Sequence, residues 1–200
     1  MRRLLEIGGV VAGAVLVVFG IVAIVMAIDA RTTVRDSIEQ EQIFFSSTDD
    51  PAVAKYASKW AGEQVKTGEQ ARAFAQIMRE HTISGTEGLT YAQMGRFQAT
   101  DPKGDDGLGG TNDEAKAVKD EATGQPVSNG RRTIWVTETA LSNALNMSYM
   151  AENLALFSLV VGIALLLTGV GLIVLAVAVL GRAPATAPAG AQIKAAPVTS

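Results

Sequence analysis

Two stretches decide the fold: residues 7–28, IGGVVAGAVLVVFGIVAIVMAI, and residues 154–180, LALFSLVVGIALLLTGVGLIVLAVAVL. Neither contains a charged side chain. As an α-helix, the first stretch would measure about 33 Å, which is enough to cross a hydrocarbon layer of about 30 Å. Apolar runs of this length are typical of membrane spans rather than of buried core helices. The sequence therefore predicts two transmembrane helices, at 7–28 and 154–181.

A signal peptide is the alternative interpretation of the first stretch, because Arg2 and Arg3 give it a basic start. Its apolar run is longer than an ordinary signal-peptide core. The sequence Ile28-Asp29-Ala30 also lacks the small-x-small pattern of a cleavage site. We therefore expect an uncleaved membrane anchor.

The charge distribution predicts that both termini lie in the cytoplasm. Residues 29–152 hold 13 Lys and Arg and 19 Asp and Glu, a net charge of −6, whereas the rest of the chain carries +3. Positively charged flanks favour the cytoplasmic side, although Arg31 and Arg35 lie near the outer end of the first span. The predicted segments are a cytoplasmic N-terminus (1–6), the first span (7–28), an extracytoplasmic helical domain (29–153), the second span (154–181) and a disordered cytoplasmic tail (182–200).

Apolar stripes at helical spacing extend both spans beyond the membrane, so the predicted fold is an all-α hairpin of two transmembrane helices carrying a small extracytoplasmic helical domain. The stripes consist of Ile28, Val34, Ile38 and Phe45 after the first span, and of Leu141, Leu145 and Tyr149 before the second. We expect the two extensions to end at the same height, about 24 Å above the membrane, under a cap of Phe44, Phe45 and Trp135.

Three N-cap motifs predict shorter helices between these extensions. Asp50-Pro51 places an acidic cap before a proline at the first helical position, and Val53, Ala57 and Trp60 would line the inner face. Thr67 to Gln70 and Thr90 to Gln93 are capping boxes, which predict a helix ending at Gly85 and another reaching Phe97. Residues 98–112 are expected to form a loop. Thr111 to Glu114 has the pattern of a cap for a short polar helix reaching Ala122, but the few apolar positions of this segment favour a solvated surface turn. Residues 133–137 are expected to form an extended piece.

Glycines in the two apolar stretches are spaced for helix packing. Gly9 and Gly13 form a small-xxx-small pair, and Gly20 lies seven residues after Gly13. Gly162 and Gly169 repeat the spacing of seven. We expect the two spans to pack against each other within one chain, with Gly20 and Gly169 at similar depth. A dimer face is the alternative.

The residue inventory excludes several classes of chemistry. The chain has no cysteine, one histidine and a net charge of −3, which excludes thiol chemistry, a multi-histidine metal site in one chain and nucleic-acid binding by the chain as a whole. His81 follows the apolar face of Phe74, Ile77 and Met78, so we expect a structural or exposed histidine. A pH-sensing role is the alternative.

Other clusters are expected to be solvated or structural, so no catalytic, cofactor-binding or metal-binding residue is predicted. Asp101, Asp105, Asp106 and Asp113 do not have the spacing of a calcium-binding EF-hand loop. The glycines of this region lack the lysine of a phosphate-binding loop. The remaining residues weighed in this way are Gly104, Gly107, Gly109 and Gly110 of that loop, the basic pair Arg131–Arg132, and the core aromatics Phe44, Phe45, Trp60 and Trp135.

Four segments carry a family resemblance: DSIEQEQIFFSSTDDPAVAKYASKWAGEQV (36–65), TGEQARAFAQIMREHT (67–82), TYAQMGRF (90–97) and TETALSNALNMSYMAENLALF (137–157). They resemble uncharacterised two-span membrane proteins of high-GC Gram-positive bacteria, some of which are named aromatic ring-opening dioxygenases of the LigA type. Ring opening by non-haem iron uses two histidines and a carboxylate. A chain with one histidine does not support that activity.

These observations predict a non-enzymatic, multi-pass protein of the cell membrane, an accessory or scaffold component of an envelope or membrane complex. Its expected partners are the lipid bilayer and either further copies of itself or a larger membrane complex, with no nucleic acid and no cofactor. Three alternatives stay open: an extracytoplasmic sensor or regulator, an oligomeric pore, and a hydrolase that uses carboxylates of the outer domain.

Overall fold

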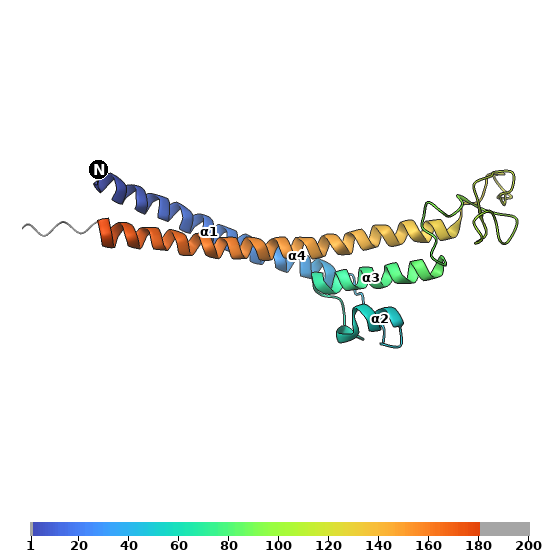
Figure 1. The fold of residues 1–200 in the computed structure, drawn as a ribbon, viewed down its shortest axis with the longest axis horizontal. Coiled ribbons are helices and arrows are strands. Elements are labelled where there is room, and N and C mark those ends of the chain that lie inside the picture. Colours follow the sequence, from blue (N-terminus) through green and yellow to red (C-terminus); the bar gives the residue numbers. More distant parts are fainter. Residues whose placement is uncertain (1, 181–200) are drawn as a thin grey trace, which may run out of the picture. The chain divides into compact units, whose positions relative to one another are not determined.

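The computed structural model describes the backbone of residues 2–180 and the side chains of residues 3–178. The chain is mostly helical (Figure 1). Its elements are α1 (Arg2–Gln40), α2 (Pro51–Tyr56), the 3-10 turn η1 (Ser58–Trp60), α3 (Gly68–Gly85), β1 (Phe97–Gln98), β2 (Gly110–Thr111), α4 (Gly130–Leu175) and the π-helical turn η2 (Ala176–Leu180). The predicted tail at 182–200 and the last residue of the second predicted span lie outside the described residues.

Two helices, Arg3–Gln40 and Gly130–Ala178, are long and apolar enough to cross a membrane. Their most apolar 18-residue windows have mean hydropathies of 3.0 and 2.8, and only 17% of each window is buried within the chain. A core helix of a water-soluble protein would be mostly buried, since burial is what stabilises its apolar side chains. Both helices instead leave most of their apolar surface uncovered by the protein.

The chain forms two compact units: unit 1 takes its described residues from Met1–Ile24 and Val160–Ser200, and unit 2 is Val25–Leu159. In unit 1, segments of α1 and α4 run antiparallel and meet at glycines. A Cβ atom on Gly13 would lie 2.6 Å from the carbonyl oxygen of Gly169, and one on Gly20 would lie 2.7 Å from that of Gly162. Such approaches admit only glycine. The expected register is wrong, because Gly13 rather than Gly20 faces Gly169.

Unit 2 contains α2 and α3 and the ends of α1 and α4, and α3 lies antiparallel to α4 (Figure 1). The first two predicted caps are confirmed. The Asp50 carboxylate accepts from the Ala52 N–H at the start of α2. Thr67 and Gln70 form a complete capping box at the start of α3. Each cap satisfies backbone donors that have no partner inside the helix.

The aromatic core of unit 2 differs from the predicted cap. The rings of Phe45 and Trp60 stack with centroids 5.9 Å apart, and Phe74 meets Phe45 edge-on at 5.8 Å. Phe44 is exposed, and Trp135 is buried beside Arg79 instead. The extensions also end at different heights, because α1 stops at Gln40 whereas α4 begins at Gly130, 22 residues before Glu152.

The segment between α3 and α4 folds as turns and short pairings, and the predicted helix from Thr90 to Phe97 is absent. Thr90 and Gln93 make their capping contacts, yet only a turn follows. A Cβ atom on Gly95 would lie 2.1 Å from the Thr111 nitrogen, so this backbone crossing needs glycine. β1 pairs antiparallel with β2 beside it. This two-residue pairing is a small departure from an all-α fold. Residues 111–122 form turns and bends, as their few apolar positions favour.

The predicted extended piece at 133–137 is the first part of α4. The Asn129 side chain accepts from the Arg131 N–H, and the Thr133 N–H bonds to the Asn129 carbonyl. These contacts start the helix before the β-branched residues Thr133, Ile134 and Val136. The preference of such residues for strands depends on context, and here tertiary packing outweighs it. Trp135 and Glu138 then lie buried on the face of α4 that meets the rest of unit 2.

Candidate functional site

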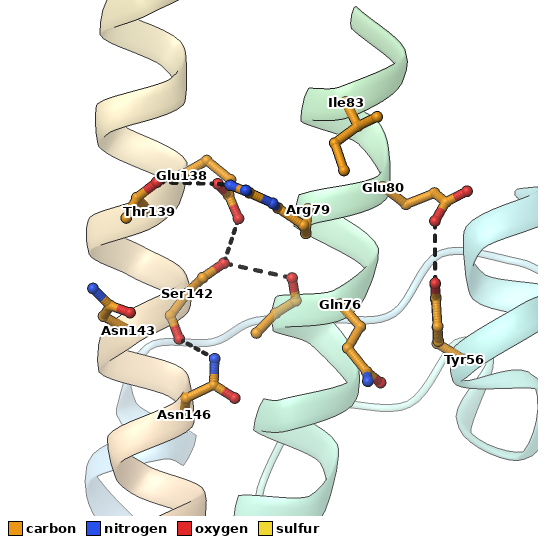
Figure 2. A pocket seen from close by; sticks show the side chains of 11 residues that line it. Tyr56, Gln76, Arg79, Glu80, Ile83, Glu138, Thr139, Ser142, Asn143 and Asn146 are labelled. Carbon is orange, nitrogen blue, oxygen red and sulfur yellow. Dashed lines mark hydrogen bonds and ion pairs between the residues drawn. The ribbon is translucent and has the colours of Figure 1, made fainter. Parts of the chain in front are cut away.

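A polar pocket lies between α3 and α4 in unit 2 (Figure 2). Its cavity measures about 470 Å³, and it opens to solvent. Glu138 and Arg79 point toward each other across it, and Tyr56 and Glu80 meet at its rim. The residues that line it are Tyr56, Ala75, Gln76, Arg79, Glu80, Ile83, Glu138, Thr139, Ser142, Asn143 and Asn146. Both helices contribute because they lie side by side along this stretch.

Glu138 is the central group of this pocket, and its side chain is 4% exposed. The Arg79 guanidinium lies 3.0 Å from Oε2, and the Ser142 hydroxyl donates to Oε1 at 2.7 Å. Arg79 also covers the Trp135 ring, with 4.2 Å from its Cζ to the ring centroid. A buried carboxylate needs such partners, because an unpaired charge would be strongly destabilising. The pocket therefore presents a paired, hydrogen-bonded carboxylate rather than a free base.

Glu152 forms a second polar centre, where α1, α3 and α4 meet. Arg31 and Arg35 of α1 donate to its Oε1 atom through Nε, at 3.0 and 2.7 Å. The Gly68 N–H, at the first residue of α3, donates to Oε2 at 2.6 Å. Burial alone would raise the pKa of Glu152, but these donors outweigh burial and lower the pKa below its ordinary value. Glu152 is therefore a charged group that joins three helices.

His81 does not extend the apolar face of α3. Its side chain is 54% exposed, and its Nε2 lies 3.0 Å from the Asp50 carboxylate. The hydrogen bond to His81 lowers the pKa of Asp50, the residue that caps α2. The only histidine of the sequence thus reinforces a helix cap and does not reach the Glu138 pocket.

The acidic loop residues are used to hold the loop together. Asp106 accepts backbone N–H bonds from Gly95, Leu108 and Gly110. Burial raises the pKa of the Asp106 carboxyl, but these three donors outweigh burial and lower it. Asp105 bonds the Thr111 hydroxyl and pairs with a lysine. Within residues 3–178, acidic and histidine side chains form no group of three that could hold a metal ion.

The remaining candidates also have structural contacts. Asp101 and Asp113 accept N–H bonds from residues two positions further along their turns. Arg131 donates to the carbonyl of Gly85 at the end of α3, and Arg132 covers the Tyr91 ring at 3.9 Å. The glycines of this loop serve tight turns and close backbone contacts. The structure brings none of these described candidates to the Glu138 pocket.

Glu138 and Glu152 were not predicted as site residues from the sequence. One signal was present, because Glu138 is the only charged residue between Arg132 and Glu152 in a long run of uncharged residues. A lone carboxylate in such a run is typical of a buried, paired group. Its partner Arg79 is 59 residues away in sequence, and no local pattern predicts that distance.

Comparisons with protein-family models, curated proteins and solved structures give no match to this chain.

Proposed function

We propose that this chain is a non-enzymatic membrane protein that serves as an accessory or scaffold component of a membrane or envelope complex. In the proposed topology, residues 7–28 and 154–181 span the membrane and both termini are cytoplasmic. Residues 29–153 then form an extracytoplasmic helical domain. The low burial of both apolar windows supports the spans, since a bilayer would cover the surfaces that the protein leaves open.

One observation carries the assembly role: the exposed surface of α4 within residues 133–151 has no charged side chain. The only charged residue in that range is Glu138, which is buried. The exposed residues on one face of this stretch are Val136, Ala140, Asn143, Met147 and Met150, called here the α4 stripe. Surface helices in water normally carry charged residues on their outer face. An uncharged face outside the membrane is typical of an interaction surface.

The spacing of the α4 stripe indicates what it can bind. Its residues follow one another at alternating intervals of four and three, which is the pattern of helix pairs that pack at a shallow angle. Ala140 lets a second helix approach closely, and the two methionines adapt to its side chains. Asn143 is exposed, lines the mouth side of the Glu138 pocket and offers its amide to a partner (Figure 2). The stripe therefore suits an uncharged helix, from a second copy or from another membrane protein.

The proposal is tested by photo-crosslinking from single cysteines, which the cysteine-free sequence permits. A thiol-reactive benzophenone is attached to Met147→Cys, on the stripe, or to Leu141→Cys as a matched control. Leu141 is also exposed on α4 but lies about 120° around the helix. Illumination of native membranes should give one defined adduct from position 147 and little from position 141.

The mass of the adduct identifies the assembly. A species of twice the chain mass indicates a self-assembled scaffold, a different defined mass an accessory subunit, and a ladder of several copies a ring that could form a pore. Equal adducts from both positions, or none from Met147→Cys, would contradict an assembly role for the stripe.

A further inference from the structure

We propose that unit 2 binds the phosphodiester headgroup of an anionic phospholipid in a cavity beside Glu152, with Arg31, Arg35 and Arg72 as the binding residues. This inference rests on the proposed two-span topology, because the cavity must lie at a membrane surface. It goes further by assigning a ligand class to a site formed by three helices.

The cavity has the size and charge for a phosphate group. It measures about 520 Å³ and contains the guanidinium groups of three arginines. Glu152 is the carboxylate whose ionic partners all lie inside the cavity. The other carboxylate on its wall, Glu69, pairs with Lys59 at 3.0 Å. The residues that line the cavity are Arg31, Arg35, Thr67, Glu69, Arg72, Tyr149, Glu152, Asn153 and Leu156. The site therefore has an excess of positive charge, which favours an anion.

Glu152 orients two of the three arginines without using all their donors. Arg35 reaches it through Nε and Nη2, at 2.7 and 2.6 Å. Arg31 reaches it through Nε, and its two Nη atoms donate to no other described residue. Arg72 is exposed and lies over the Tyr149 ring, with Cζ 4.7 Å from the centroid, which is a cation–π contact. Its hydrogen-bonding nitrogens likewise have no partner among the described residues. Guanidinium groups held in this way suit a phosphate, because their planar donors bind its oxygens in pairs.

An apolar groove continues from these arginines. A second cavity, of about 270 Å³, shares Arg31, Arg35 and Leu156 with the first. Its other lining residues are Ala27, Ile28, Thr32, Ala155 and Leu159. A charged end joined to an apolar channel matches a phospholipid, whose phosphate is followed by acyl chains. Free phosphate has no apolar part that could fill this groove.

The depth of the arginines also fits a headgroup. Arg31 is three residues beyond the end of the first proposed span and Arg35 is seven, or about 4.5 and 10 Å along a helix. The headgroup layer extends about 5–8 Å beyond the hydrocarbon core on each side. Arg31 therefore lies at phosphate level, with Arg35 just outside it.

The test uses the full chain, purified in mild detergent and incubated with equal amounts of phosphatidylglycerol and phosphatidylcholine. Native mass spectrometry then counts the lipids retained. We expect about tenfold more phosphatidylglycerol, because each arginine at a membrane surface favours anionic lipid severalfold. Arg72→Gln should lower that preference about fivefold. Arg132→Gln is the matched control, since Arg132 also stacks on a tyrosine but lies outside the cavity, and it should leave the preference unchanged.

Each other outcome overturns a defined part of the inference. Equal retention of the two lipids, or equal losses in Arg72→Gln and Arg132→Gln, would overturn the lipid site while leaving the topology intact. Displacement of phosphatidylglycerol by excess inorganic phosphate would show a free-phosphate site and overturn the lipid assignment. Extraction of the chain from membranes by alkaline carbonate would overturn the two-span topology and the lipid site together.

Discussion

Glu152 connects three helices of unit 2 through its side chain. Its two carboxylate oxygens accept from α1 and from the first residue of α3, while its backbone belongs to α4. A carboxylate at the start of α3 also interacts favourably with the positive end of that helix. Loss of its charge therefore removes a contact from three helices at once.

Glu152→Gln should lower the free energy of unfolding by about 2 kcal/mol, because hydrogen bonds to a charged group are replaced by bonds to a neutral amide. Denaturant unfolding of the full chain in mild detergent measures the change. Glu114→Gln, at an exposed loop carboxylate, is the control and should change stability by less than about 0.5 kcal/mol.

The same contribution should depend on pH. The pKa of Glu152 is lower in the folded chain than its ordinary value of 4.5, so the folded state favours the charged form. This stabilisation is complete above pH 4.5 and is lost as pH falls through the folded-state pKa. The difference between wild type and Glu152→Gln should shrink in that acidic range. A difference that stays constant down to the acid limit would show that the charge does not stabilise unit 2.

At the scale of the elements, two similar motifs lead to different structures. The capping box at Thr67 precedes Phe74 and Ile77, which pack against the core, and a full helix follows. The box at Thr90 precedes Met94 and then Gly95, where the backbone crosses another strand. A cap satisfies donors at a helix start, but packing supplies most of the stability of a helix. The sequence therefore predicted α2 and α3 correctly and wrongly predicted a helix after Thr90.

The contacts of the sites were less predictable than the elements. N-cap motifs act within four residues, so Asp50 and Thr67 could be assigned from local spacing. Glu138 with Arg79, and Glu152 with Arg31, join residues 59 and 121 positions apart. Such pairs depend on how helices align, which no short pattern encodes.

The glycine register shows the same limit. Gly13 and Gly20 are seven residues apart, as are Gly162 and Gly169. Sliding one helix by seven residues therefore still places one glycine opposite another. Local spacing indicates which faces meet but does not distinguish these two registers.

Gly13→Leu should destabilise the pairing of α1 and α4 in unit 1, because a side chain there would collide with the backbone at Gly169. Overpacking of this kind costs about 1–3 kcal/mol. Gly8→Leu is the control, since a Cβ atom at Gly8 meets nothing within 4 Å. Thermal unfolding in mild detergent should show a lower Tm for Gly13→Leu alone, and equal values for both variants would refute the observed register.

At the scale of the whole molecule, the proposed topology places residues 29–153 outside the cell and both termini inside. Ser47→Cys and Glu121→Cys test it, because both side chains are exposed and the chain has no other cysteine. Asp106 is unsuitable for labelling, since its carboxylate holds the loop. A membrane-impermeant thiol reagent should label both positions in intact cells. Labelling only after lysis would reverse the orientation.

The glycine contacts of unit 1 form late during synthesis, because their two partners lie far apart in the sequence. In the proposed topology, 125 residues separate the end of the first span from the start of the second. At about 5–20 residues per second, the first span waits about 6 to 25 seconds in the membrane before the second span is made. Until then the exposed backbone at Gly13 and Gly20 contacts lipid, or another transmembrane helix that is present nearby. Other helices can therefore compete with the second span for the glycine face of the first span until synthesis is complete. An insertase that holds the first span during that time would increase the fraction of correctly paired chains.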